Sequence, residues 1–299
     1  MKDIIIIGGG PAGLTAAIYA GRSGKSVLLF EGKSFGGQIS KSHKVENYPG
    51  FEEISGFEFS MKLKNQAELF GAEIIQKKVK DVKEKDGIFT VTSDTDYESK
   101  AVIFALGTEP KRSGIPDEDT LVGRGLSYCA TCDGNFFRGR TVAVIGGGNT
   151  AVQDALYLSD ICKKVYLVHR RDAFRAEKSL VKKAEEKENI EFVLDSLLIS
   201  AEASPIIKSI TVENKITGER SELPVNGLFM AIGQTPLTAD FADILPLDSY
   251  GYVAVQENCT VKNGVYVCGD CRAKDIRQLT TATADGTVAA TKAIEYIDG

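Results

Sequence analysis

The chain has 299 residues, of which 43% are hydrophobic and 26% charged, as expected of a globular protein with about two domains. Its formal net charge of -5 weighs against nucleic acid as the main partner, and no apolar run is long enough for a signal peptide or a membrane span, so we expect a cytoplasmic protein. Six cysteines are too few for a secreted scaffold held together by disulfides.

The first predicted unit, residues 4–31, occurs again later in the chain as residues 142–169, and the two align without a gap. Each copy reads as a short apolar strand, a glycine-rich turn, an amphipathic helix and a second apolar strand. This order predicts the βαβ unit that binds dinucleotides. One glycine turn of this kind is weak evidence, because such turns are common, but two in the same context are specific.

The glycine spacing fits G-x-G-x-x-G in the first copy and G-x-G-x-x-A in the second. The first glycine makes the tight turn, the second lets the backbone approach a pyrophosphate, and the third position needs a small residue where helix and strand pack. The helix that follows presents free N–H groups to the phosphates. The motif positions are Gly8, Gly10 and Gly13, then Gly146, Gly148 and Ala151.

The two copies differ at the end of the second strand. The first ends at Glu31, whose carboxylate can accept hydrogen bonds from an adenosine ribose, whereas the second has His169, followed by Arg170 and Arg171, with Arg175 nearby. Guanidinium groups bind phosphate bidentately, so this cluster favours a 2′-phosphate; the alternative is a solvated basic run. We therefore expect two dinucleotides in a hydride relay, most simply FAD and NADPH.

Between the two copies lies "CATCD", in which two residues separate Cys129 from Cys132 and Asp133 follows. Half of a zinc site, a structural disulfide and a redox-active pair all share this spacing. A structural disulfide is disfavoured in a reducing compartment, which leaves a metal site or a redox pair. Asp133 is the nearest candidate acid for proton transfer, with a role as a turn residue as its structural alternative.

The C-terminal part contains a second C-x-x-C, formed by Cys268 and Cys271, so four cysteines could in principle make a tetrahedral zinc site. Cys268 ends the apolar run "GVYVC" and is expected to point into a packed sheet. The stretch "RQLTTATADGTVAATKAIEYI" then predicts a helix that begins near Gln278. Its N-terminal end, beside Arg277, favours the negative charge of a reduced flavin; a purely structural docking helix is the alternative.

These motifs resemble those of the low-molecular-weight thioredoxin reductases over nearly the whole chain. The matching stretches are "GGGPAGLTAA", "GGQ", "VENYPGF", "CATCDG", "GGGNTAVQDALYLS", "HRRDAFRA", "GD" and "RQLTTATADG". The resemblance implies a homodimeric flavoenzyme that passes electrons from NADPH through FAD to its own disulfide and then to thioredoxin or a thioredoxin-like protein.

The resemblance also implies an α/β fold with two Rossmann-like, three-layer dinucleotide-binding domains. The FAD domain would be discontinuous, formed by residues 1–111 and 241–299. The NADPH domain, residues 112–240, would carry the C-x-x-C and be inserted between these segments.

By the same resemblance, Cys132 faces the flavin, Cys129 attacks thioredoxin and Asp133 handles the proton. The residues expected to bind FAD are Gly8, Gly10, Pro11, Ala12, Gly13, Glu31, Gly36, Gly37, Gln38, Asn47, Gly107, Gly269, Asp270, Arg277, Gln278 and Leu279. The residues expected to bind NADPH are Gly146, Gly148, Asn149, Thr150, His169, Arg170, Arg171, Arg175 and Gly233.

A zinc site shared by both cysteine pairs would overlap the glycine and aspartate assigned to FAD, so no metal is expected. Cys268 departs from the small residue usual at its position and is interpreted as a buried hydrophobe, with a redox role beside the flavin as the alternative. Cys162 aligns with Gly24 at the turn between helix and strand of the repeat, which explains it structurally, and Cys259 lacks a partner or catalytic neighbour. The rival functions are a reductase for another thioredoxin-like carrier and a non-catalytic flavin or zinc protein.

Overall fold

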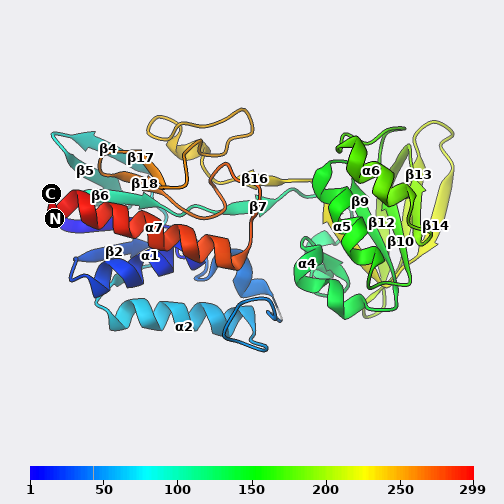
Figure 1. The fold of residues 1–299 in the computed structure, drawn as a ribbon, viewed down its shortest axis with the longest axis horizontal. Helices are drawn as coiled ribbons and strands as arrows, with labels where there is room; N and C mark the ends of the chain where they lie inside the picture. Colours follow the sequence, from blue (N-terminus) through cyan, green and yellow to red (C-terminus); the bar gives the residue numbers. More distant parts are fainter. Residues whose placement is uncertain (43) are drawn as a thin grey trace. The chain divides into compact units, whose positions relative to one another are not determined.

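The computed structural model describes residues 1–42 and 44–299, and these form two compact units (Figure 1). The discontinuous unit combines Met1–Glu109 with Thr235–Gly299, and the central unit is Pro110–Gln234. The chain crosses between them in β7 (Thr108–Pro110) and β16 (Gln234–Pro236), which pair as a two-stranded sheet. No helix in the described ranges is long and apolar enough to cross a membrane.

An eight-stranded sheet is the centre of the discontinuous unit, with its main strands in the order β17-β18-β6-β1-β2-β3. The strands β1, β2, β3, β6 and β18 run parallel, whereas β17 pairs antiparallel with β18 and the β4–β5 hairpin pairs antiparallel with β6. The strand bounds are β1 (Lys2–Ile7), β2 (Val27–Phe30), β3 (Glu73–Ile75), β4 (Asp81–Lys85), β5 (Ile88–Thr92), β6 (Asp96–Phe104), β17 (Thr260–Lys262) and β18 (Val265–Val267).

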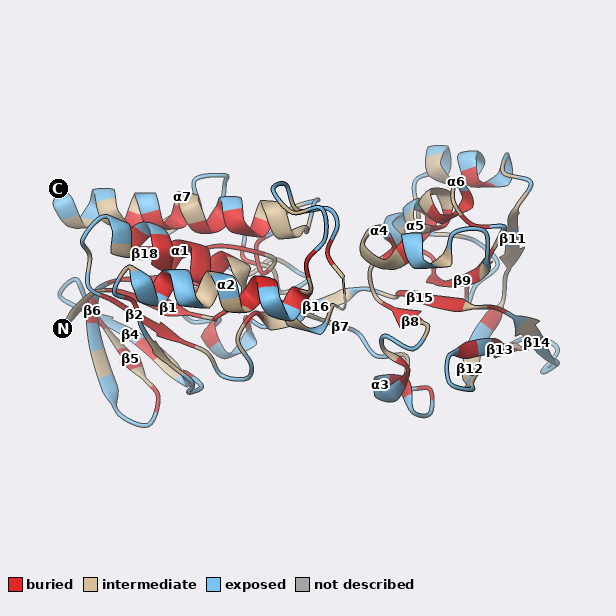
Figure 2. Cartoon of the chain, turned by 90° about the horizontal axis from the view of Figure 1, so that it is seen from below, coloured by how far each residue is buried: buried red, intermediate tan, exposed pale blue. Residues whose placement is uncertain are grey.

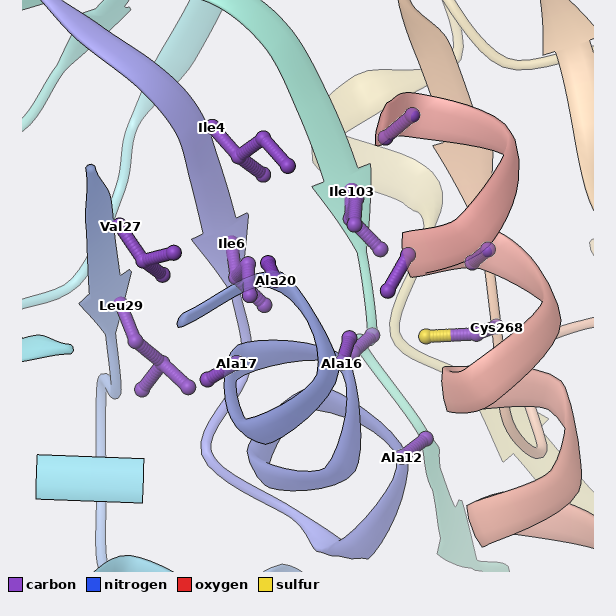
Figure 3. Packing of buried hydrophobic residues seen from close by; sticks show 14 of the residues in the cluster. Ile4, Ile6, Ala12, Ala16, Ala17, Ala20, Val27, Leu29, Ile103 and Cys268 are labelled. Carbon is purple, nitrogen blue, oxygen red and sulfur yellow. The ribbon is translucent and has the colours of Figure 1, made fainter. Parts of the chain in front are cut away.

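Side chains that alternate along β1 enter two separate cores, because successive residues of a strand face opposite sides of a sheet. Ile4 and Ile6 pack with the helices α1 (Pro11–Arg22) and α7 (Leu279–Asp298), as Figure 3 shows. Ile5 and Ile7 pack on the opposite face with residues such as Phe89. Continuously apolar strands of this kind are typical of a parallel sheet covered on both faces.

The helices α1 and α7 pack closely because small residues line their contact. A Cβ on Gly286 of α7 would lie only 2.2 Å from the carbonyl oxygen of Ala12, so any larger residue would force the two helices apart. The helix α2 (Gly56–Leu69) packs on α1 and has buried and exposed residues along its length (Figure 2). Its Phe59 is buried, whereas Phe57 and Leu69 are exposed. The short helices η1 (Gly37–Lys41) and η3 (Ala239–Phe241) complete this unit.

The central unit has three layers built around a parallel five-stranded sheet in the order β11-β10-β9-β15-β8. The helices α4, α5 and α6 pack on one face, and the antiparallel sheet β12-β13-β14 packs on the other. The strand bounds are β8 (Leu126–Ser127), β9 (Thr141–Gly146), β10 (Lys164–Val168), β11 (Ile190–Val193), β12 (Ser196–Ala203), β13 (Ile207–Asn214), β14 (Arg220–Pro224) and β15 (Gly227–Ala231). The helices are α3 (Glu118–Leu121), α4 (Ala130–Asp133), η2 (Gly134–Phe137), α5 (Asn149–Ser159) and α6 (Lys178–Glu185).

The repeated sequence unit forms the same structure twice, as β1–α1–β2 and as β9–α5–β10. This confirms the predicted strand, turn, helix and strand in both copies and the two Rossmann-like folds. The predicted C-terminal helix is also confirmed, since α7 begins at Leu279 with Gln278 as its N-cap. The domain boundaries expected from the resemblance, 111/112 and 240/241, lie beside crossings that the contacts place at 109/110 and 234/235.

Candidate functional site

The first glycine turn joins β1 to α1, and its three motif glycines have different surroundings. A Cβ on Gly8 would lie 2.2 Å from the carbonyl oxygen of Ala105, and one on Gly13 would lie 1.9 Å from the carbonyl oxygen of Gly8. At Gly10, by contrast, no atom of the described residues lies within 4 Å of the Cβ position. The turn is therefore closely packed at Gly8 and Gly13 and open at Gly10, as binding of a pyrophosphate requires.

The second glycine turn, between β9 and α5, repeats this arrangement. A Cβ on Gly146 would lie 2.4 Å from the carbonyl oxygen of Ala231, and Ala151 at the third motif position is fully buried. Gly148 is open in the same way as Gly10 within the described residues. Asn149 begins α5, and Thr150, its second residue, is exposed, so the predicted residues after the motif lie at the start of the helix.

The residues at the ends of the second strands contact their glycine turns in two different ways. The Glu31 carboxylate accepts hydrogen bonds from the backbone N–H groups of Gly9 and Lys33, both at 2.7 Å. His169, at the aligned position, packs on Gly147, where a Cβ would come within 2.1 Å of the imidazole Cε1. The first copy thus places a carboxylate beside its turn, and the second places a buried imidazole there.

The loop after His169 is attached to the second glycine turn by main-chain and side-chain hydrogen bonds. The N–H of Arg175 donates to the carbonyl of Gly147 at 2.8 Å, and the N–H of Glu177 donates to Asn149 Oδ1 at 2.9 Å. Asn149 Nδ2 donates in return to the Glu177 carboxylate at 3.2 Å. The loop therefore holds a group of exposed arginines near the turn: Arg170, Arg171 and Arg175.

His169 is almost fully buried, with 5% of its surface exposed, and stacks on Phe174. Burial lowers the pKa of His169, and the neighbouring arginines lower it further, so the imidazole is neutral at pH 7. Its Nε2 is buried and has no hydrogen-bond partner in residues 1–42 and 44–299. Gly233, the remaining residue predicted for NADPH, has φ +108° and accepts a hydrogen bond from the N–H of Lys111 at 3.0 Å.

Several segments of the discontinuous unit converge around the first turn. The N–H of Gly36 donates to the carbonyl of Gly9 at 2.8 Å, and a Cβ on Gly37 would lie 3.5 Å from the Cα of Gly10. Gln38 Nε2 donates to the carbonyl of Thr108 at 3.1 Å. These contacts bring the predicted "GGQ" stretch to the glycine motif and close to Gly107, whose φ is +67°.

The start of α7 joins the same region. Asn47 Nδ2 donates to Gln278 Oε1 at 3.3 Å, and Leu279 is the first residue of the helix. Gly269 approaches α1 from the other side, because a Cβ there would lie 2.9 Å from the Cβ of Ala12, next to Pro11. The structure therefore brings residues predicted for FAD together from stretches that are far apart in the sequence.

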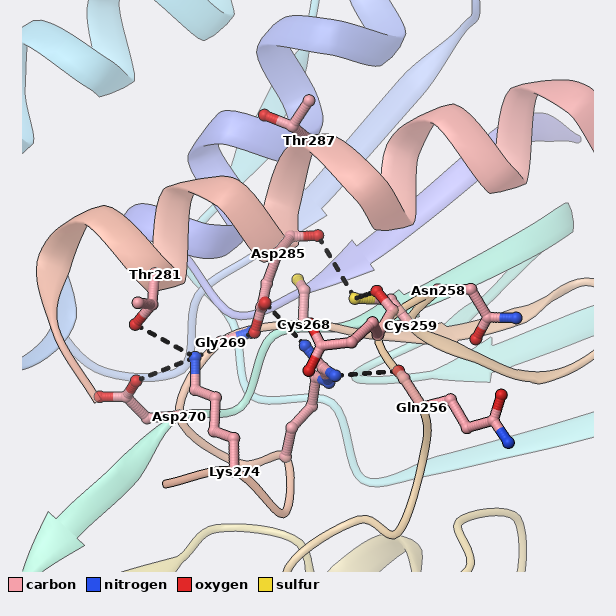
Figure 4. A network of polar contacts seen from close by, with 12 residues as sticks. Gln256, Asn258, Cys259, Cys268, Gly269, Asp270, Lys274, Thr281, Asp285 and Thr287 are labelled. Carbon is pink, nitrogen blue, oxygen red and sulfur yellow. Dashed lines mark hydrogen bonds and ion pairs between the residues drawn. The ribbon is translucent and has the colours of Figure 1, made fainter. Parts of the chain in front are cut away.

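The loop 269–274 is anchored by one carboxylate of α7, that of Asp285 (Figure 4). Asp285 accepts hydrogen bonds from the N–H of Gly269 at 3.0 Å, from Arg272 Nη1 at 2.7 Å and from Lys274 Nζ at 3.0 Å. Arg272 is only 2% exposed, and removing one partner of such a buried ion pair costs about 3–5 kcal/mol. Arg277 is held separately, above the ring of Tyr252 and by hydrogen bonds to carbonyl groups of this loop.

Asp270 lies in this anchored loop with an oxygen available for a ligand. Its Oδ1 is inaccessible to solvent and has no hydrogen-bond partner within the described ranges, although a third of the whole side chain is exposed and Lys274 Nζ lies 3.7 Å away. Burial raises the pKa of Asp270, and Lys274 and Arg277 oppose this rise. A buried acceptor of this kind suits a ligand hydroxyl, so Asp270, Glu31 and the open turn at Gly10 fit the ribityl chain, ribose and pyrophosphate of FAD.

Cys129 and Cys132 form a disulfide at the start of α4, which makes them a bonded pair. Cys129 is the N-cap of the helix, and its Sγ accepts a hydrogen bond from the N–H of Cys132 at 3.2 Å. Asp133, the last residue of α4, accepts a hydrogen bond from the Ser127 hydroxyl at 2.5 Å. The predicted acid is therefore held on the same short helix as the two sulfur atoms.

Tyr128, directly before Cys129, is fixed by a charged network. Its hydroxyl donates to the buried Glu118 carboxylate at 2.6 Å and accepts from Arg112 at 2.8 Å. Burial and the hydrogen bond to Glu118 raise the pKa of Tyr128 to about 12, so the phenol stays protonated and can donate. This network attaches the segment that follows β7 to the residue before the disulfide.

The second C-x-x-C is not a pair in the structure. Cys268 packs with Ile4 and the helices on one face of the sheet, whereas Cys271 packs with Ile5 on the opposite face. Both are free cysteines and fully buried. The interpretation of Cys268 as a buried hydrophobe is therefore confirmed, and the sheet separates the two thiols.

Reduced protein in its native fold is expected to present only two thiols to Ellman's reagent, those of Cys129 and Cys132. The other four cysteines are buried, and the reagent reacts with thiolates. Burial raises the pKa of Cys162 and Cys271 to about 11 and that of Cys259 to about 12, and it raises the pKa of Cys268 well above its ordinary value. Thiols should be counted after dithiothreitol reduction, first in buffer and then in guanidinium chloride, where all six should react. Four reactive thiols in buffer would contradict the burial.

Sequence reasoning missed the residues that hold the predicted ones in place. Ser127 and Glu118 belong to no motif, and Asp285 lies within "RQLTTATADG". The one local signal is an acid inside an Ala/Thr-rich helical stretch, at Asp285. A charged residue on an apolar helix face indicates an internal partner.

Comparisons with known proteins agree with this geometry. Residues 2–286 match the family described as pyridine nucleotide-disulphide oxidoreductase. A thioredoxin reductase of Peptoclostridium acidaminophilum is 41% identical, with 99% of this chain and 97% of that protein covered. One of Bacillus subtilis (strain 168) is 40% identical, with 99% and 95% covered. The crystal structure of thioredoxin reductase from Streptococcus pyogenes MGAS5005 has a TM-score of 0.94 and 38% identity, covering 100% of this chain and 98% of that one.

Proposed function

The chain belongs to the pyridine nucleotide-disulphide oxidoreductases and, within them, to the thioredoxin reductases, and from that premise we propose which of its residues perform each step. Its reaction is the NADPH-dependent reduction of a thioredoxin disulfide, with FAD as the cofactor. Bound FAD supplies two-electron transfer between the nicotinamide and a disulfide.

We assign FAD binding to the residues around the first glycine turn. Glu31 accepts hydrogen bonds from the adenosine ribose, the backbone at Gly10 binds the pyrophosphate, and Asp270 accepts from a ribityl hydroxyl. The contacts of Gly36, Asn47 and Gln278 support this assignment, because they bring the other predicted residues to the same place.

NADPH binding is assigned to the second glycine turn. Gly148 and the start of α5 bind the pyrophosphate, and the arginines after His169 bind the 2′-phosphate. The attachment of that loop to Gly147 and Asn149 supports the proposal, since it keeps the guanidinium groups close to the turn.

Disulfide exchange is assigned to Cys129 and Cys132. The N–H of Cys132 points at Cys129 Sγ, and a hydrogen bond to the charged form of a thiol favours the thiolate. This supports Cys129 as the nucleophile that attacks thioredoxin, forming a mixed disulfide. Cys132 then attacks the Cys129 sulfur, which restores the internal disulfide and releases reduced thioredoxin. Asp133 accepts the Cys132 proton and returns it to the departing thiolate.

The observation that carries the proposal is the bonded Cys129–Cys132 pair beside an acid, in a unit that also contains the arginine-flanked glycine turn. The test is an assay of purified protein with NADPH and oxidised thioredoxin. We expect about two new thioredoxin thiols for each NADPH consumed, and much slower reaction with NADH. Consumption of NADPH without the appearance of thioredoxin thiols would overturn the assignment and favour a plain oxidase.

We further propose that the chain acts as a homodimer in the cytoplasm and has no nucleic-acid partner. The family resemblance supports the dimer, and the net charge of -5 supports the last point. Analytical ultracentrifugation of the purified protein tests the oligomeric state, and a single species at the mass of one chain would contradict the dimer.

A further inference from the structure

We propose that Ser127 is a positioning residue, whose hydroxyl holds the Asp133 carboxylate in its ionised form for proton transfer during disulfide exchange. The inference rests on the proposed function, because it needs Asp133 to be the group that accepts the proton. Ser127 lies outside the C-x-x-C motif and six residues before Asp133, a spacing at which the chain itself does not bring two side chains together.

The hydroxyl proton of Ser127 has one good hydrogen-bond acceptor, the Asp133 carboxylate. The N–H of Cys129 donates to Ser127 Oγ at 3.0 Å, which uses a lone pair of the hydroxyl. The hydroxyl oxygen lies 2.5 Å from Asp133 Oδ2 and 3.3 Å from the Cys129 carbonyl oxygen. The carboxylate is both the nearer and the charged acceptor, so the proton of Ser127 points to Asp133.

Ser127 is itself held firmly, so it can fix the position of another group. It is 5% exposed and belongs to β8, where it pairs with Phe229 of β15 in the central sheet. Tyr128, the next residue, is fastened to Glu118. Asp133 is attached a second time through its own N–H, which donates to the Cys129 carbonyl at 3.1 Å. The hydroxyl therefore connects a rigid strand to the end of the helix that carries the disulfide.

The exchange step needs the ionised carboxylate that this hydrogen bond favours. As Cys132 attacks the mixed disulfide, its S–H proton moves to Asp133, the Cys129–Cys132 bond forms and the bond from Cys129 to thioredoxin breaks. The departing thioredoxin thiolate then takes the proton from Asp133. A hydroxyl donor stabilises the carboxylate form more than the acid form. Without this donor, a smaller fraction of Asp133 is ionised and able to accept the Cys132 proton as the pH falls.

The effect of Asp133 on the pH profile has to be distinguished from that of other titratable or charged groups on neighbouring elements. Cys129 and Cys132 share its helix, Tyr128 precedes it, Arg138 follows η2, and α5, which packs on α4, carries Asp154 and Tyr157. Burial raises the pKa of Asp154 to about 7, within the range of an activity profile. An Asp154→Asn variant is therefore part of the test.

The experiment measures kcat/KM for oxidised thioredoxin from pH 5 to 9 in the holoenzyme. In Ser127→Ala, we expect the acid limb to move up by about one pH unit, so that kcat/KM falls increasingly below that of the unchanged protein toward pH 5 and differs little from it at pH 8. Flavin reduction by NADPH, followed by absorbance, should be unchanged. The matched control is Ser196→Ala, because Ser196 is also 5% exposed in the central unit but donates to a backbone carbonyl at 2.8 Å.

A double-mutant comparison separates positioning from a structural role. In an Asp133→Asn background, Ser127→Ala should cause no further loss, because the serine acts through the carboxylate. An unchanged profile in Ser127→Ala, an equal loss in both backgrounds, or an acid limb that disappears in Asp154→Asn would each overturn the inference. If Asp133→Asn alone kept normal turnover, the proposed role of Asp133 would fail instead, which distinguishes the two failures.

Discussion

Replacing Cys132 with serine is expected to lower thioredoxin reduction by roughly a thousandfold or more, while FAD and NADPH still bind. The serine oxygen cannot form the disulfide with Cys129, so no site remains that can store the electron pair or restore itself after exchange. Cys129→Ser should have an effect of similar size. The two cysteines act as one unit, so the double variant should lose little more than either single variant.

The matched control for this pair is Cys162→Ala, because Cys162 is a cysteine of the same central unit that is buried and free. Its turnover should stay close to that of the unchanged protein. Flavin absorbance and the ratio of flavin to protein show whether each variant is folded and loaded. A Cys132→Ser protein that keeps its flavin and still reduces thioredoxin would contradict the assignment of the disulfide.

Removing the charge of Arg171 and Arg175 together is the second large effect that we expect. The Arg171→Ala, Arg175→Ala variant should raise KM for NADPH about a hundredfold and leave KM for NADH nearly unchanged, because only NADPH carries the 2′-phosphate. Each charge-assisted contact between a guanidinium and phosphate contributes about 1.5–3 kcal/mol, so two contacts account for a change of this size. The measurement is initial rates with both nucleotides at several salt concentrations.

Arg220 provides the control for the arginine variant, because it is exposed in the same unit and pairs with Glu213 at 2.7 Å on the antiparallel sheet. Arg220→Ala should leave both KM values unchanged. An equal rise in KM for NADPH and NADH would mean that the arginines support the loop rather than bind the phosphate. A preference for NADPH that survives the double substitution would place the 2′-phosphate elsewhere.

The sequence predicts the parts of the fold and of the site that depend on local spacing. The glycine turns, the helix beginning after Gln278 and the βαβ units follow from periodicity and small residues at fixed intervals, and the structure has them where expected. The contrast between Glu31 and His169 is also local, because each residue ends a strand directly beside its own turn.

The rest depends on which segments meet in three dimensions, and local spacing carries no information about that. Ser127 reaches Asp133 only because a strand end faces the end of α4. Asp285 accepts hydrogen bonds from Gly269 and Lys274, which precede it by 16 and 11 residues and share no motif with it. Cys268 and Cys271 show the opposite case, where spacing suggests a pair that the sheet separates.

The most direct test of the central claim, a flavin coupled to the Cys129–Cys132 disulfide, is an anaerobic titration of the purified yellow protein with NADPH. The flavin absorbance band is followed until it stops changing. About two equivalents should be consumed per flavin, and about one in Cys132→Ser, because the disulfide takes up the second electron pair. Complete reduction of the unchanged protein by one equivalent would contradict it, since the disulfide would then receive no electrons.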